Sequence, residues 1–185
     1  MKIYFHRNIE NSSNCYVVVN EDLKEAVIID PGKITKEMIS QFEDYGYVPK
    51  AVLITHNHPA HIRGLTTLLK IYDVQIYAGE AQILGFQTNM ISQEGELTLA
   101  GLNIQYCCIP GHTPDSICYK IGSVIFSGDV ISAGKIGETN SNYSKMILKK
   151  GIEQKILVQN EDTTIMPGHG PLTSVAAEKS FNLDL

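Results

Sequence analysis

The sequence contains no tryptophan and only two arginines, Arg7 and Arg63, among its 185 residues. Arginine recognises phosphate through two parallel hydrogen bonds, and a nucleic-acid surface needs a dense basic patch, which a net charge of −5 does not favour. No apolar run approaches the ~18 residues that cross a bilayer, and the first residues do not resemble a signal peptide. We therefore expect a cytoplasmic protein that binds neither nucleic acid nor membrane.

The four cysteines lack the paired spacing of a zinc ribbon or a redox motif. Cys107 and Cys108 are neighbours in an expected strand, where adjacent side chains point to opposite faces, so we expect no disulfide between them. We interpret Cys15, Cys107, Cys108 and Cys118 as reduced thiols that pack as small hydrophobic side chains.

Length and composition indicate a single domain spanning residues 1–185, with 43% hydrophobic and 19% charged residues. A chain of this length buries roughly two-thirds of its unfolded surface on folding, so it needs no cross-links. The sequence shows no low-complexity stretch, no long linker and no repeat of fixed period.

Hydrophobic periodicity predicts an α/β protein in which two packed sheets have helices on their outer sides. Strands are expected at residues 2–6, 15–20, 25–30, 51–54, 74–77, 97–99, 104–109, 116–121, 123–126 and 163–166. Helices are expected at residues 34–45, 62–72, 80–84, 143–147, 151–158 and 175–181.

Five of the six histidines occur in three short loops, and each loop follows an apolar strand. These loops are residues 55–61, 110–115 and 167–170, and a fourth strand runs into Asp129. Loops at strand ends are where a rigid scaffold directs side chains into a shared cleft. One histidine alone is more often packed than a ligand, but burying five without partners costs several kcal/mol in sum. Imidazole and carboxylate suit Zn²⁺, Fe²⁺ or Mn²⁺, so we predict a metal centre here and regard His6 as structural.

These motifs resemble those of small metallo-β-lactamase-fold hydrolases of the glyoxalase II-like (hydroxyacylglutathione hydrolase-like) group. The matching segments, in the family's order, are Asp30-Pro31-Gly32, His56-x-His58-x-x-His61-x-x-Gly64, Pro110-Gly111-His112-Thr113-Pro114, Ser127-Gly128-Asp129 and Pro167-Gly168-His169-Gly170. The resemblance implies a four-layer αββα sandwich of two mixed β-sheets flanked by helices, with a metal cleft along one edge.

The resemblance also implies two metal positions that share one carboxylate. The first is formed by His56, His58, His112 and Asp129. The second is formed by His61, His169 and Asp129, together with an aspartate directly before His61. This chain has Ala60 in the place of that aspartate, and a methyl group neither binds a metal nor orients water. We therefore expect one well-held metal, with Zn²⁺ ahead of Fe²⁺ or Mn²⁺, and a weak second position.

Asp115, three residues after His112, is a candidate for the missing carboxylate, although a solvated loop aspartate is the commoner case. Thr55, Thr113 and Ser127 are expected to hydrogen-bond ligand side chains, a role that metal sites usually need filled. No separate cofactor-binding motif is present.

We predict a metal-dependent hydrolase that uses a metal-bound water on a thioester or a similar small acyl substrate, with Asp129 and His61 as catalytic residues. Loss of one orienting group commonly costs on the order of 10²-fold in rate, so Ala60 predicts a slow enzyme. Two alternatives stay open. One is an oxidoreductase with one Fe²⁺ that acts on a persulfide, and the other is a family member disabled at residue 60, either naturally or by engineering. The oligomeric state is left open.

Overall fold

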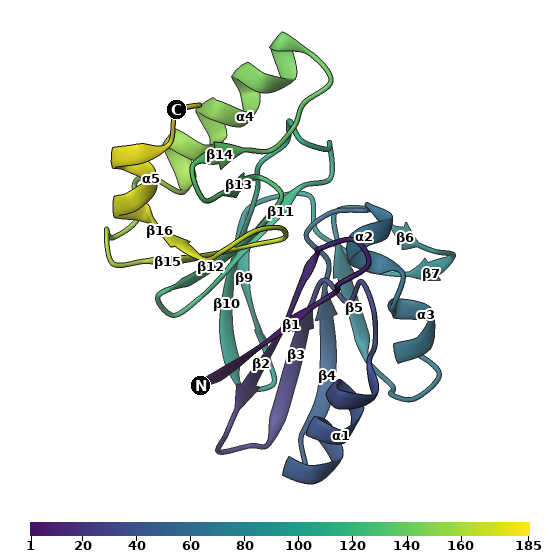
Figure 1. The fold of residues 1–185 in the computed structure, drawn as a ribbon. Helices are drawn as coiled ribbons and strands as arrows, with labels where there is room; N and C mark the ends of the chain where they lie inside the picture. Colours follow the sequence, from purple (N-terminus) through teal and green to yellow (C-terminus); the bar gives the residue numbers. More distant parts are fainter.

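The computed structural model describes residues 1–185, and the first half of the chain forms one six-stranded sheet with its outer helices (Figure 1). Its elements are β1 (Lys2–Arg7), β2 (Asn14–Asn20), β3 (Glu25–Ile29), α1 (Lys36–Tyr45), β4 (Val48–Leu53), α2 (Pro59–Ile62), α3 (Leu65–Leu68), β5 (Gln75–Ala78), β6 (Gln82–Ile83), β7 (Phe86–Gln87) and β8 (Asn89–Met90). The strand order is β1-β2-β3-β4-β5-β8, antiparallel from β1 to β3 and parallel from β3 to β8.

The second half of the chain forms the second six-stranded sheet. Its elements are β9 (Gly95–Leu99), β10 (Leu102–Cys108), β11 (Ile117–Ile121), β12 (Val124–Gly128), β13 (Ile131–Ser132), β14 (Lys135–Ile136), α4 (Asn142–Lys155), β15 (Thr164–Pro167), β16 (Thr173–Ser174) and α5 (Val175–Phe181). The order is β16-β15-β12-β11-β10-β9, in which only β12 and β15 run parallel.

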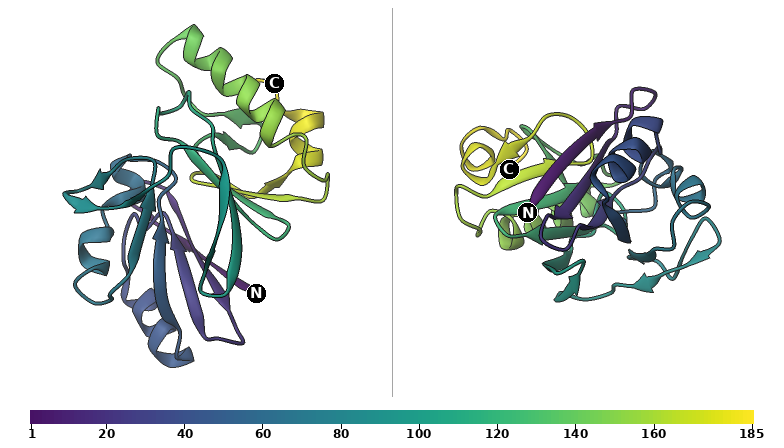
Figure 2. Two further views of the ribbon diagram at one scale, coloured as in Figure 1. Left: turned by 180° about the vertical axis from the view of Figure 1, so that it is seen from behind. Right: turned by 90° about the horizontal axis from the view of Figure 1, so that it is seen from below.

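The two sheets pack face to face, with α1 to α3 outside the first and α4 and α5 outside the second (Figures 1 and 2). Strand β2 shows how alternation builds these layers, because its successive side chains point to opposite faces. Tyr16 and Val18 pack between the sheets, whereas Val17 and Val19 pack under the outer helices. The expected four-layer αββα arrangement is therefore confirmed.

Adjacent cysteines follow the same rule, as expected. Cys108 packs between the sheets and Cys107 packs on the outer face of the second sheet, and all four cysteines are free. None of the helices combines the length and the apolar character needed for a membrane crossing.

Four expected helices differ from the structure. The helix predicted at residues 80–84 is wrong: this segment contributes to the β6–β7 hairpin, whose turn places Leu84 and Gly85 at φ values of 50° and 83°. The two helices predicted at 143–147 and 151–158 are one helix, α4, because Gly151 continues the helix close against Ile109.

The helix predicted at 62–72 is replaced by two single-turn helices, α2 and α3, the first of which begins earlier, at Pro59. The carbonyl of Ala60 accepts hydrogen bonds from Ser13 and Asn11, and the backbone N–H of Gly64 donates instead to Pro31 at 2.8 Å. Contacts with the N-terminal segment thus interrupt a helix that the apolar periodicity favours.

Candidate metal centre

Four loops that follow β4, β10, β12 and β15 meet at one edge of the sandwich and bring all six predicted ligand residues together. They form two groups in which the possible donor atoms lie within 4.8 Å of one another. The first group contains His56, His58, His112 and Asp129, and the second contains His61, Asp129 and His169. Their proximity is an observation, whereas their action as ligands stays a prediction.

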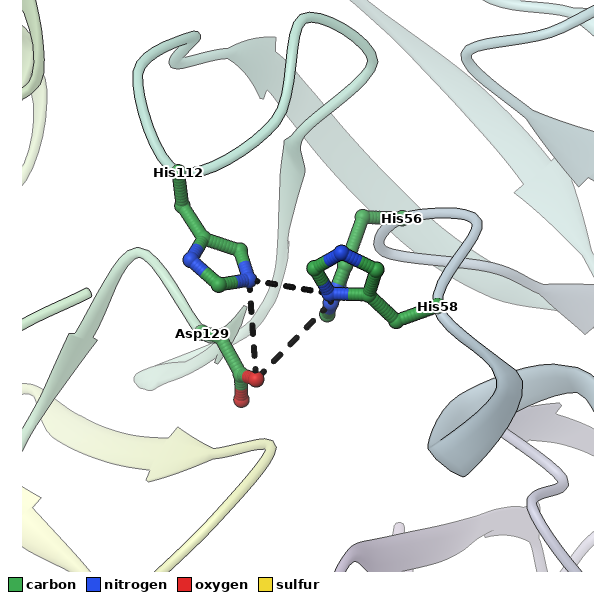
Figure 3. Close-up of side chains that lie close together, drawn as sticks. All are labelled: His56, His58, His112 and Asp129. Atoms are coloured by element: carbon green, nitrogen blue, oxygen red, sulfur yellow. Dashed lines mark hydrogen bonds and ion pairs between the residues drawn. The ribbon is translucent and has the colours of Figure 1, made fainter. Parts of the chain in front are cut away.

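The first group presents three imidazole nitrogens toward one point (Figure 3). His58 Nδ1 lies 2.9 Å from His56 Nε2 and 3.1 Å from His112 Nε2. Asp129 Oδ2 lies 3.8 Å from His56 Nε2 and 3.7 Å from His112 Nε2. Ligand atoms at 2.0–2.1 Å from a tetrahedral Zn²⁺ are about 3.3 Å from one another. The observed distances between donor atoms lie on either side of this value, at 2.9 and 3.1 Å and at 3.7 and 3.8 Å.

Hydrogen bonds on the far side of two rings determine which nitrogen carries the proton. His112 Nδ1 lies 2.8 Å from the carbonyl oxygen of Glu138, to which it must donate. His56 Nδ1 lies 3.0 Å from Thr55 Oγ1, whose own hydrogen is donated to Asp30 Oδ2 at 2.6 Å, so Nδ1 donates here as well. In its neutral form each of these rings therefore turns an unprotonated Nε2 toward His58.

These tautomers give an observation that favours a cation. Two lone pairs, on His56 Nε2 and His112 Nε2, point at His58 Nδ1, which can supply at most one hydrogen. At least one lone pair is therefore left without a hydrogen inside the group. Histidine lone pairs that converge beside a carboxylate fit a divalent metal.

The second group is built around a fully buried histidine, His61, that lies between two carboxylates. His61 is fully buried, and its Nδ1 lies 3.1 Å from Asp30 Oδ2 while its Nε2 lies 3.5 Å from Asp129 Oδ2, yet neither nitrogen has a hydrogen-bond partner of good geometry. His169 Nδ1 lies 2.8 Å from Asp129 Oδ1. Gly168 allows this packing, because a Cβ there would lie 2.5 Å from Asp129 Oδ1.

The pKa values of the two groups move in opposite directions. Burial lowers the pKa of His56 to about 3, and burial together with His112 lowers the pKa of His58. Burial also acts to lower the pKa of His61, but the charges of Asp30 and Asp129 outweigh burial and raise this pKa to about 10. Burial acts to raise the pKa of Asp129, but the hydrogen bond of His169 and the nearby ring of His61 hold it well below its usual value. The first group is thus ready to accept a cation, whereas the second already holds a proton.

Ala60 lies half-buried in the first turn of α2, and its methyl group adds no donor to the second group. Asp115, the candidate for the missing carboxylate, belongs to neither group. Its Oδ2 instead accepts a hydrogen bond from the backbone N–H of Asn57 at 2.8 Å.

Asn57, between two predicted ligands, is held from both sides. Asp115 accepts its backbone N–H, and Glu80 Oε2 accepts its side-chain Nδ2 at 2.6 Å. Asp115 precedes β11 in the second sheet and Glu80 follows β5 in the first, so both sheets position the loop between His56 and His58. Sequence reasoning missed this role, since neither contact has a local signal.

Of the three hydroxyl residues expected to contact ligands, Thr55 alone does so, through His56. Thr113 Oγ1 lies 2.7 Å from Ser116 Oγ, and Ser127 Oγ donates to the carbonyl of Ile131 at 2.8 Å, so both stabilise their own loops. Sequence reasoning also missed Asp30 as the carboxylate next to His61. Its place at the end of an apolar strand, like that of Asp129, was the available signal.

Comparisons with known proteins agree with this geometry. The metallo-beta-lactamase superfamily profile matches residues 9–89. The hydroxyacylglutathione hydrolase GloC of Haemophilus influenzae is 31% identical over 195 residues, covering 91% of each chain. The chain belongs to the metallo-beta-lactamase superfamily. The probable metallo-hydrolase YqgX of Bacillus subtilis is 28% identical, over 92% of this chain and 90% of its own.

Among solved structures, the BLEG-1 B3 metallo-beta-lactamase matches with a TM-score of 0.86 and 29% identity, covering 98% of each chain. The predicted family and fold are therefore confirmed. This superfamily contains metal-binding hydrolases, and the two groups described above form a His/Asp metal-binding cluster at the expected edge of the sandwich.

Proposed function

We propose that this metallo-beta-lactamase superfamily member is a hydrolase of thioesters or similar small acyl compounds that works with one metal ion, Zn²⁺, in the first group. The observation that carries the proposal is a pair of unprotonated imidazole nitrogens, on His56 and His112, that both point at His58 Nδ1 beside Asp129. His58 Nδ1 carries at most one hydrogen, so at least one of the two lone pairs is free to bind a metal. The similarity to GloC, named as a hydroxyacylglutathione hydrolase, supports the substrate class.

Three histidines and Asp129 would hold the metal. A divalent metal bound there supplies a water of lowered pKa and polarises the acyl carbonyl. Thr55 and the Glu138 carbonyl keep the rings of His56 and His112 in the tautomers that can bind it. His58 is exposed, so the substrate reaches the group from the side on which His58 lies.

Asp129 is the residue that we assign to the reacting water. Its depressed pKa keeps the carboxylate ionised at neutral pH, so it would accept a hydrogen bond from that water and orient the water toward the acyl carbon. His169 and His61 hold the orientation of this carboxylate. Because Ala60 supplies no second carboxylate, the water is oriented from one side only and the expected rate is low.

The remaining parts of the proposal concern the surroundings of the reaction. We propose a cytoplasmic protein whose partner is a small-molecule substrate, with no nucleic acid or membrane involved. The acidic net charge of −5 and the scarcity of arginine support this.

The experiment that tests the proposal measures metal content per chain by elemental analysis, on protein as purified and after loading with Zn²⁺ or Fe²⁺ and desalting. Hydrolysis is then measured on a panel of thioesters, esters and lactams. We expect close to one equivalent of zinc and slow thioester hydrolysis. Two equivalents would show that the interpretation of Ala60 is wrong. No metal and no hydrolysis would indicate a disabled member, and iron with oxygen uptake on a persulfide would indicate an oxidoreductase.

A further inference from the structure

Cys107 and Cys118 lie directly opposite each other on neighbouring strands of the second sheet. Cys107 is on β10 and pairs in register with Cys118 on β11, and both side chains pack on the outer face, on the side of α4. Two residues further along the same ladder, the N–H of Ile109 donates to Ser116 at 2.9 Å. The cysteine pair therefore occupies a hydrogen-bonded position, where Cα atoms are about 5.5 Å apart, within the range that a disulfide requires.

A cavity of about 470 Å³ opens at this pair, and none of the residues that line it belongs to the metal cluster. Both cysteines line it together with Tyr106, Lys155 and Glu94. Cys107 is partly exposed there, whereas Cys118 is buried beneath it. A small molecule that enters the cavity therefore meets Cys107 before it meets Cys118.

The surroundings give the two thiols different reactivity. The neighbouring Cys118 thiol and the charge of Lys155 outweigh burial and lower the pKa of Cys107. The pKa of Cys118 is raised by the neighbouring Cys107 thiol and by burial. Lys155 is anchored by a hydrogen bond to the carbonyl of Cys108 at 2.9 Å and by an ion pair with Glu94, so its charge stays near the cavity. A thiol that ionises more readily is the better attacking group.

The other two cysteines lack these properties. Cys108 points between the sheets, with its Sγ 3.8 Å from the carbonyl of Gln93, and burial raises its pKa. Cys15 is buried under the outer helices of the first sheet, where burial also raises its pKa. Cys107 is therefore the one cysteine that is partly exposed, lines the cavity and has a buried cysteine directly opposite it.

We propose that Cys107 and Cys118 form a reversible thiol–disulfide exchange site for a low-molecular-weight disulfide, whose organic group occupies the cavity. The Cys107 thiolate attacks one sulfur of the disulfide, forms a mixed disulfide and releases the other half as a thiolate. Cys118 then loses its proton and attacks Cys107 Sγ, which forms the Cys107–Cys118 disulfide and releases the second half. The small disulfide is reduced to two thiols, which take up the two cysteine protons, while the pair is oxidised.

The test uses the full-length reduced protein and glutathione disulfide as the probe. After incubation, free thiols are blocked by alkylation and each cysteine is located by peptide mass spectrometry. We expect a Cys107–Cys118 disulfide as the main product, with Cys15 and Cys108 alkylated. Modification that starts at Cys108 or Cys15, or alkylation of all four cysteines at disulfide concentrations that oxidise an ordinary dithiol, would overturn the proposal.

Variants separate the two steps. Cys118→Ser should stop at the mixed disulfide and accumulate at least about tenfold more glutathione on Cys107 than the unchanged protein, because the resolving thiol is absent. Cys107→Ser should take up none, and the matched control Cys108→Ser should react at the unchanged rate. If a variant fails to fold, the location of the disulfide in the unchanged protein by peptide mass spectrometry still tests the proposal. Adducts on Cys107 that Cys118 never resolves would refute the exchange site.

Discussion

The two donor groups share Asp129, but the first favours a metal ion and the second favours a proton. The first has three histidines whose lone pairs converge, burial lowers the pKa of His56 and of His58, and two of the rings are held from behind by a hydroxyl and a carbonyl. The second has two histidines, one of them flanked by the carboxylates of Asp30 and Asp129. A carboxylate behind a histidine favours a proton on the ring when no metal competes for it. The groups behind the histidines therefore influence, as much as the number of donor atoms does, which of the two positions would take a metal first.

Removal of a histidine from the first group should have the largest effect. We expect His112→Ala to lose most of the bound metal and to reduce hydrolysis by more than the roughly 10–100-fold that loss of a ligand's hydrogen-bond partner costs. Elemental analysis and the thioester assay measure both. His6→Ala is the matched control, since His6 bonds to Gln41 at 2.9 Å outside the cluster. Unchanged metal content in His112→Ala would refute the assignment of the first group.

Loss of the support for the loop between His56 and His58 should have the next largest effect. Asp115→Ala removes the acceptor of the Asn57 N–H, so we expect metal affinity to fall by roughly 10–100-fold. Competition with a chelator measures this affinity. Asp115→Asn keeps an acceptor oxygen and should recover most of the affinity, and Glu80→Gln should change little. Equal losses in all three variants would indicate a general effect of charge instead.

Restoring a carboxylate beside His61 should make the two groups more alike. We expect Ala60→Asp to raise the metal content from about one to about two equivalents, because it supplies the second group with a fourth donor. Ala60→Asn, which has a similar size and a weaker donor, should gain less. If Ala60→Asp stays at one equivalent while it remains folded, the proton held by His61 rather than residue 60 limits the second group.

The smallest expected effect concerns pH. In metal-free protein the pKa of His61 is raised from 6.5 to about 10, so its charge stabilises the fold fully below pH 6.5 and this stabilisation is lost as the pH rises to 10. The His61→Asn variant lacks this charge, and therefore the stabilisation, at every pH. The Tm difference between the unchanged protein and His61→Asn should therefore narrow between pH 6.5 and 10, as measured by thermal unfolding with a chelator. A constant difference would show that His61 is uncharged.

Local patterns predicted the parts of the molecule that depend on neighbours in sequence. Strand runs in both halves of the chain, flanked by helical periodicity, were enough to expect two packed sheets, and the strand-end positions of His56, His112 and Asp129 were enough to expect a metal cluster. The family resemblance added the four-layer order and the place of the cluster at one edge. The hairpin at β6–β7 was missed because its turn depends on the left-handed backbone of Leu84, a residue whose type does not signal it.

Long-range contacts account for what was missed at the site. Asp30 and His61 are 31 positions apart, and Asn57 and Asp115 are 58 apart, so no spacing rule connects them. The difference between His56 and His61 arises from the group behind each ring, which is the Thr55 hydroxyl for His56 and the Asp30 carboxylate for His61. Only the three-dimensional arrangement shows that.

Each sheet is built from one half of the chain, so the ribosome completes the first sheet before it has made the second. At roughly 5–20 residues per second, the inner face of the first sheet, which includes Val18 and Ile29, stays uncovered for several seconds during synthesis. His56, His58 and His61 emerge in that interval, whereas His112, Asp129 and His169 follow with the second half. The predicted ligands therefore come together only after the two halves have docked, so metal capture by them would be a late step in biogenesis.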